Sequence, residues 1–137
     1  MWPKLTADTL THFPKSNGDS VLPSQCRNES DGWKQCIESI LEIRSLEDGW
    51  DGQGTEAPTP EVVDSAMILA VMLRERNVRP PTSTVQGMCG DVGFEWQWWN
   101  STTLNLEVTE PYGADILFLT PGEIAEHSTI RQLVAAQ

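Results

Sequence analysis

The residues best suited to acid–base or cation chemistry lie in a glycine-rich loop near the middle of the chain. Asp48, Asp51 and Glu56 fall close together there, interleaved with glycines that include Gly52 and Gly54. Paired carboxylates can exchange protons with a reacting bond, and their oxygens also bind hard cations. The spacing does not follow the calcium-loop pattern of alternating acids before a glycine. A small hydrolase or metal-binding protein that uses this loop is one hypothesis.

The same loop has a structural interpretation, which we favour. Its glycines predict left-handed backbone or a close approach to another segment. Trp50 would then pack over the junction of two helices, and Asp51 would cap the turn or pair with Arg44. No Lys followed by Ser or Thr comes after Gly52 and Gly54, so a phosphate-binding loop is not indicated.

The cysteines and histidines do not indicate nucleophilic catalysis or a metal centre. A catalytic Ser or Cys needs a base beside it, and neither His12 nor His127 has such a context in the sequence. Cys26, Cys36 and Cys89 are odd in number and form no C-x-x-C pair, which predicts reduced thiols without a zinc cluster. We therefore predict no catalytic residue, no metal and no cofactor, and expect a binding protein rather than an enzyme.

Charge gives the strongest indication of a partner. The 137 residues carry a net charge of −11, so we expect no direct binding to nucleic acid or to an anionic membrane surface. Residues 80–130 contain seven acids and no Lys or Arg. Glu95 and Glu107 occupy outward strand positions there, which predicts an acidic sheet face. That face either serves solubility alone or steers the protein toward a basic partner.

The elements that position these residues follow from hydrophobic periodicity. Residues 31–46 have an apolar stripe at helical spacing, and a second helix over residues 60–76 starts with Thr59 as N-cap and Pro60 at its first position. Ile68 and Met72 fall on the polar side of this second helix. They predict either a docking patch or a surface covered by N-terminal apolar residues.

From residue 82 the period changes to two. Residues 94–98 and 104–108 alternate around a turn at residues 99–102, residues 114–119 form a more apolar strand, and residues 84–88 are a weaker candidate. Phe94, Trp96 and Trp98 share one face, whereas Trp99 emerges at the hairpin end. Trp99 could anchor a protein partner, and exposed tryptophans could alternatively stack on a sugar or base.

These elements predict an α+β fold. Two helices pack on one face of a three- to four-stranded, mainly antiparallel sheet, and a short final helix from about Ser128 is one option for the tail. Residues 1–29, with three prolines and scattered apolar residues, are expected to form a loosely ordered arm, and residues 30–137 a single domain. The longest unbroken apolar run has about eight residues, too short for a membrane span. No secretory signal is visible, which predicts a cytoplasmic protein.

One motif resembles a known group of proteins. The order of an amphipathic helix, a Trp50-Asp51-Gly52-Gln53-Gly54 loop, a Pro-led helix, a Pro-Pro break and an aromatic strand resembles small bacterial and phage-type proteins with a WDGxGA signature. Thr55 and Glu56 precede Ala57 here, so the signature is imperfect. The resemblance covers roughly residues 37–120, and it implies a small two-helix-plus-sheet domain and nothing catalytic, since these proteins have no established function.

The leading hypothesis is therefore a small acidic protein-binding module. Its contacts would come from Glu95 and Glu107 on the sheet, from Trp99 at the hairpin end, or from Ile68 and Met72 on the second helix. An inhibitor, antitoxin or immunity-type protein that acts on a basic partner is the concrete form of this hypothesis.

Overall fold

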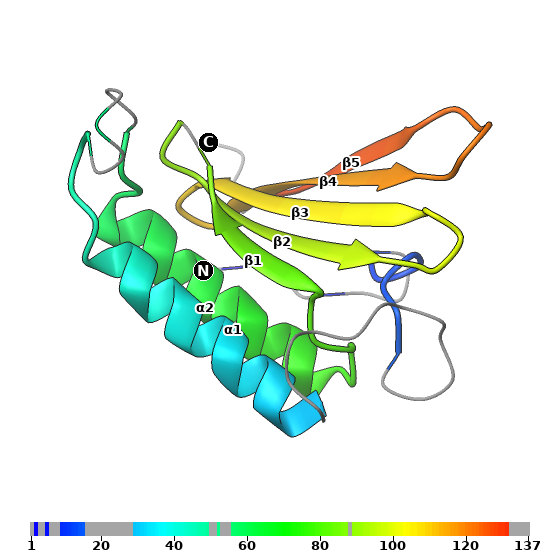
Figure 1. Ribbon diagram of the computed structural model, residues 1–137, viewed down its shortest axis with the longest axis horizontal. Helices are drawn as coiled ribbons and strands as arrows, with labels where there is room; N and C mark the ends of the chain where they lie inside the picture. Colours follow the sequence, from blue (N-terminus) through cyan, green and yellow to red (C-terminus); the bar gives the residue numbers. More distant parts are fainter. Residues whose placement is uncertain are drawn as a thin grey trace, which may run out of the picture.

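Two helices and a five-stranded antiparallel sheet make up the fold, so the protein belongs to the α+β class (Figure 1). The computed structural model describes residues 2, 5, 9–15, 29–49, 52, 56–87 and 89–131. The helices are α1 (Glu29–Arg44) and α2 (Pro60–Glu75). The strands are β1 (Ser83–Gln86), β2 (Val92–Gln97), β3 (Thr103–Glu110), β4 (Gly113–Leu119) and β5 (Glu126–Arg131), and they lie side by side in chain order.

Local sequence explains both helices. In α2 the Thr59 hydroxyl accepts a hydrogen bond from the Val62 N–H at 3.3 Å, and Pro60 stands at the start, where its missing N–H costs nothing. Arg44, which falls among the apolar residues of α1, reaches Asp64 of α2 at 2.6 Å. Both side chains of this pair are about half exposed, so it joins the two helices at little gain in stability.

The sheet corrects two predictions. It has five strands rather than three or four, and residues 126–131, where a short final helix was one option, form strand β5. β5 is an edge strand in which Ile130 is buried while residues 126–129 are exposed, so it lacks the clear alternation of a half-buried strand. Residues 132–137, which gave the tail its helical spacing, lie outside the described residues.

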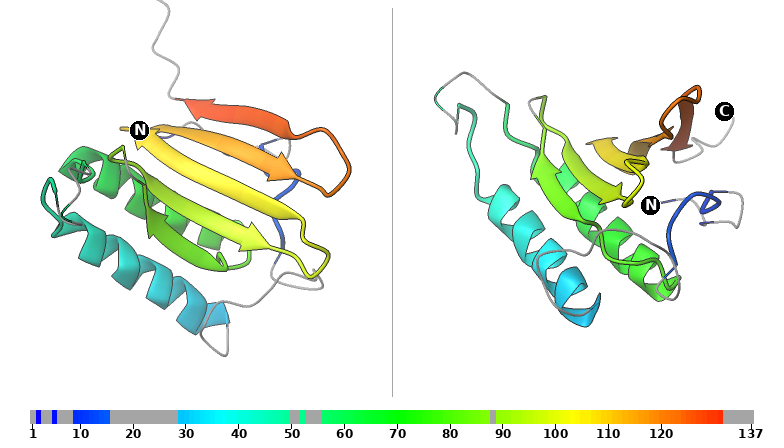
Figure 2. Two further views of the ribbon diagram at one scale, coloured as in Figure 1. Left: turned by 45° about the horizontal axis from the view of Figure 1, so that its top comes forward. Right: turned by 45° about the vertical axis from the view of Figure 1, so that its right-hand side comes forward.

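Both helices cover the same face of the sheet, and α1 packs on β1 while α2 packs on β2 and β3 (Figures 1 and 2). The core lies between these layers. Its inward residues alternate along each strand, as a half-covered sheet requires. From the strands they are Val92, Phe94, Trp96, Leu104, Leu106, Val108, Ala114, Ile116 and Ile130. None of the helices among the described residues has the length and apolar content that a membrane span demands.

N-terminal residues complete the core. Trp2, Leu5, Leu10 and Phe13 are each at most 5% exposed. The indole N–H of Trp2 donates to the Ser65 backbone oxygen at 2.7 Å, and its ring meets Tyr112 edge-on at 5.9 Å. Phe13 meets Trp96 in the same geometry at 5.3 Å. These residues therefore lie on the same face of the sheet as the helices.

Loss of the Trp2 side chain should be as costly as loss of a central core residue. We expect Trp2→Ala to lower the free energy of unfolding by about 3–5 kcal/mol, because it empties a large buried site and removes the indole hydrogen bond to the Ser65 carbonyl. Trp99→Ala, at a side chain 71% exposed, should change it by less than about 0.5 kcal/mol. Urea denaturation of both variants measures the difference, and equal effects would contradict this role for Trp2.

Candidate functional site

The glycine-rich loop is only partly described. The Asp48 carboxylate accepts a hydrogen bond from the Ala57 N–H at 3.0 Å, and Glu56 forms a parallel bridge with Cys89. Gly52 has φ of 79° and donates its N–H to the Gly49 oxygen at 2.8 Å. Trp50, Asp51 and Gly54 lie outside the described residues. The hydrogen bond between Asp48 and Ala57 joins the two ends of the loop. The described residues contain no group of three His, Cys, Asp or Glu side chains that could hold a metal ion.

Trp99 stands at the tip of the β2–β3 hairpin and is 71% exposed. The turn is closed by the Trp98 N–H donating to the Thr102 oxygen at 2.9 Å, and Ser101 has φ of 72°. Trp98 is half-buried and meets Phe118 edge-on at 6.0 Å. Among the described tryptophans, Trp99 is therefore the one that presents most of its ring to solvent. This arrangement offers a single aromatic contact rather than a stacking platform.

The two apolar candidates on α2 differ in exposure. Ile68 is 42% exposed, and Met72 is half-buried against the core. Val71 and Leu41 are also exposed, at 39% and 52%, and they were not recognised as candidates from the sequence. Ile68 and Val71 lie on the helical layer, so the structure does not bring the Ile68 position together with Glu95 and Glu107 on the sheet.

The outward side of the sheet carries the predicted acids. We call it the open face and define it by Glu95, Gln97, Asn105, Glu107, Asp115, Leu117 and His127. These positions alternate with the buried ones along β2, β3, β4 and β5. The helices lie on the other side of the sheet, and no other described helix or strand covers the open face (Figure 1).

Glu107 is the centre of this face. It lies opposite Gly93 on β2 and opposite Asp115 on β4, and Asp91 precedes β2 close by. Partial burial raises the pKa of the Glu107 carboxyl above its ordinary value, and the charges of Asp91 and Asp115 raise it further. Three carboxylates therefore share one region of the sheet surface, where Asp91 and Asp115 disfavour the ionised form of Glu107.

A shallow hollow of about 200 Å³ opens beside Glu107. Asn105, Glu107, Asp115, Leu117 and His127 line it. The His127 Nε2 atom lies 3.9 Å from the Asp115 Oδ1 atom, and on β2 the Gln97 side-chain amide donates to the Glu95 carboxylate. The hollow thus offers carboxylate oxygens and an amide around one apolar side chain. A cationic group that enters it would neutralise part of the negative charge around Glu107.

Sequence reasoning identified Glu95 and Glu107 as outward residues but missed Asp91 and Asp115 as their neighbours. Their proximity follows from the register of β3 with β4, which sets Glu107 opposite Asp115. Hydrophobic alternation predicts which face a residue occupies, whereas it does not predict which residue of the next strand lies opposite.

Comparisons with known proteins add no family to this description. No family model matches the chain, and neither a curated protein nor a solved structure matches it. The likeness to proteins with a WDGxGA loop therefore stays a resemblance, and most of that loop lies outside the described residues.

The raised pKa of Glu107 predicts a pH-dependent cost to stability. An acid whose pKa is higher in the folded than in the unfolded state destabilises the fold once it ionises, so stability falls as pH rises through this window. Glu107→Gln should therefore stabilise the protein at pH 7 by a few tenths of a kcal/mol, the scale of exposed charge interactions. The gain should vanish below about pH 4, where the carboxyl is protonated in both states.

Thermal unfolding between pH 3 and pH 8 tests this expectation. Glu75→Gln on α2, away from the open face, serves as the control for the loss of one negative charge from an acidic protein. Equal stabilisation by both variants would show that net charge, and not the surroundings of Glu107, sets the effect.

Proposed function

We propose that this protein is a small non-enzymatic binding module that recognises a basic protein partner through its open face. One observation carries the proposal: Glu107 lies beside Asp91 and Asp115 on a sheet face that no described helix or strand covers, and partial burial together with these two charges raises its pKa. Such a cluster of like charges weakens the fold slightly, and proteins commonly accept such a cost where a surface is used for binding.

Charge also favours this class of partner. Residues 80–130 include the whole of β1, β2, β3 and β4 and contain no Lys or Arg, so among the five described strands the one basic residue of this kind is Arg131 at the end of β5. A Lys or Arg side chain entering the hollow beside Glu107 would meet carboxylate oxygens from β3 and β4. Electrostatic steering by such a surface mainly speeds association and selects for a positively charged partner.

The position of Trp99 is a further argument for binding through this part of the sheet. It sits on the turn between β2 and β3, the two strands that carry Glu95 and Glu107. Exposed tryptophans are enriched among residues that dominate binding energy. An inhibitor, antitoxin or immunity-type protein that acts on a basic enzyme would combine these features, and we propose that role as the specific form of the function. The hydrolase, metal-binding and stacking alternatives stay predictions.

A charge-matched pair of variants tests the proposal. Glu95→Gln/Glu107→Gln removes two charges from the open face, and Glu38→Gln/Glu75→Gln removes two from the helical layer. The tagged protein and both variants are used for affinity purification from the native host, with mass spectrometry to identify a stoichiometric partner. We expect the helix variant to retain that partner and the open-face variant to weaken the complex at least tenfold, measured by calorimetry.

Salt provides the second readout. If open-face charges dominate, the affinity of the wild-type complex should fall as ionic strength rises from 50 to 300 mM, and the open-face variant should show a shallower dependence. A partner that both variants bind equally tightly would contradict the proposed surface. Recovery of no partner from any form would contradict the binding-module function itself.

A further inference from the structure

The outer edge of β1 presents backbone groups that β2 does not use. β1 is at one end of the sheet, and its register sets Val85 opposite Gly93 and Thr84 opposite Phe94. The Gly87 N–H donates to the Asp91 oxygen at 2.8 Å, and hydrogen-bonded pairs in antiparallel sheets occur at every second residue. Residues 83 and 85 therefore bond β2, whereas the N–H and C=O groups of Thr84 and Gln86 point away from it.

The β2–β3 pairing agrees with this assignment of alternate residues to the two sides of each strand. The Trp98 N–H donates to the Thr102 oxygen, so residues 92, 94 and 96 bond β3 and residues 93 and 95 bond β1. No other described strand pairs with this side of β1, so Thr84 and Gln86 offer two donors and two acceptors along the sheet edge. Such an edge is a template for pairing with another extended chain.

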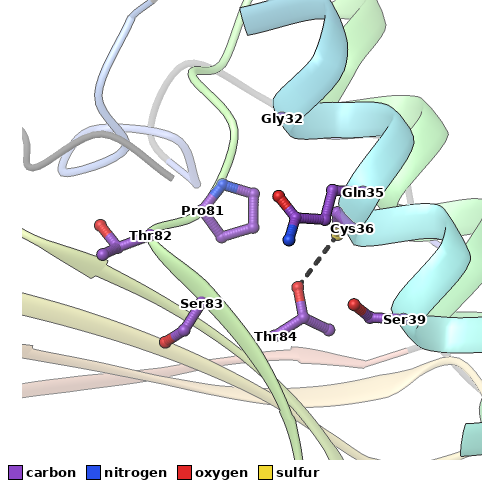
Figure 3. Close-up of a pocket in the computed structure, with 8 residues that line it drawn as sticks. All are labelled: Gly32, Gln35, Cys36, Ser39, Pro81, Thr82, Ser83 and Thr84. Atoms are coloured by element: carbon purple, nitrogen blue, oxygen red, sulfur yellow. Dashed lines mark hydrogen bonds between the residues drawn. The ribbon is translucent and has the colours of Figure 1, made fainter. Parts of the chain in front are cut away.

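A groove runs along the same edge, between β1 and α1. It consists of two hollows of about 220 and 190 Å³ that share Ser39 and Thr84. Figure 3 shows the first hollow, in which Gln35 of α1 extends toward Pro81 and Ser39 of α1 lies beside Thr84 of β1. The second continues past Gln86 to Glu42. Space for side chains therefore lies beside the backbone groups of Thr84 and Gln86 that point away from β2.

The groove is suited to binding and not to covalent chemistry. Its one thiol, Cys36, is buried, and burial raises the pKa of the thiol to about 12, so it stays protonated near neutral pH. Thr84 donates its hydroxyl hydrogen to the Cys36 sulfur at 3.2 Å. The remaining polar lining of the first hollow consists of hydroxyl and amide groups, which hydrogen-bond a ligand without reacting with it.

We propose that the β1 edge and this groove receive an extended peptide segment of a partner protein, which adds a sixth strand to the sheet. The inference rests on the proposed function, because it assigns the peptide to a partner. Main-chain hydrogen bonds to Thr84 and Gln86 hold the segment, and every second side chain of the segment enters the groove.

Charge selects the occupant. Glu42 lines the groove at the Gln86 end, so a Lys or Arg of the segment fits there. A second copy of the chain would bring together two molecules that each carry −11, which disfavours self-pairing through this edge. The chemistry of the site therefore points to a short, extended, basic segment of another protein.

A random ten-residue peptide library displayed on phage tests the inference. We expect selection on the full-length protein to enrich peptides with Lys or Arg and alternating small or apolar residues. Enriched peptides are then synthesised and titrated calorimetrically against the protein and its variants. Gln86→Pro should weaken binding at least tenfold, because it removes an outward donor that the β1–β2 ladder does not use. Gln86→Ala, which keeps that donor, should bind nearly as wild type.

Two further measurements keep the test independent of how well the proline variant folds. N-methylation of every second peptide amide should abolish binding in one register and leave it intact in the other. In the complex, amide exchange at Thr84 and Gln86 should slow, while exchange at Val85 changes little. Enriched peptides that bind Gln86→Pro fully and tolerate N-methylation in both registers would overturn the inference, as would a library that yields no binder.

The outcomes also separate this inference from the proposed function. Peptides that lose affinity for Glu95→Gln/Glu107→Gln but not for Gln86→Pro would place the segment on the open face, so the edge inference would fail and the proposed function would hold. In the converse case, peptides require the β1 edge while the host partner binds Glu95→Gln/Glu107→Gln as tightly as the wild type. That outcome would support the edge inference and contradict the open face as the binding surface.

Discussion

The two helices cover only one side of the five-stranded sheet's width, and the rest of the structure depends on this constraint. α1 packs on β1 and α2 on β2 and β3, so the helices do not reach across all five strands. The inward face of β4 must still be buried, because it carries Ala114 and Ile116. On the β4 side, the His12 ring stacks on Phe118 with 4.0 Å between centroids, and Trp2 meets Tyr112 just before β4 while its indole bonds the backbone of α2. The chain therefore buries its sheet with three segments rather than two.

The same arrangement divides the surface of the molecule into regions of different chemistry. On the helical layer, Ile68 and Val71 of α2 are exposed apolar side chains. On the open face the acids concentrate around Glu107, where the pKa is raised. Burial on one side and alternation along the strands are sufficient to place Glu95 and Glu107 outward. The absence of Lys and Arg from residues 80–130 is a property of the sequence that folding alone does not require.

Periodicity predicted those parts of the structure in which one face is buried and the other is wet. Both helices and the β2–β3 hairpin are of this kind, and Thr59 and Pro60 mark the start of α2 through local chemistry. β5 was missed because an edge strand with Ile130 as its buried residue has no alternation to detect. The burial of Trp2 was also not predictable, because it depends on how far the helical layer extends over the sheet.

The candidate site shows the same division. Outward placement of Glu107 follows from its neighbours Leu106 and Val108, whereas its proximity to Asp115 depends on the register of β3 with β4. The groove beside β1 depends on the distance between α1 and this edge strand. No pattern in the sequence indicates that distance, so the groove could not be predicted. Hydrophobic alternation thus predicts which side chains point to solvent. Strand register and the packing of helices on the sheet determine which of these side chains lie close together.

The β1 edge and the open face belong to one continuous surface of the sheet. Glu95 lies directly opposite Ser83, so a strand added outside β1 would be two strands away from Glu95. That separation is about 10 Å, which a Lys or Arg side chain on the added strand can largely span. A partner segment at the edge would therefore carry its outward basic side chains toward the acids of the open face. Backbone pairing would fix the orientation of the partner, and Glu95, the open-face carboxylate nearest to the added strand, would favour a basic side chain on it.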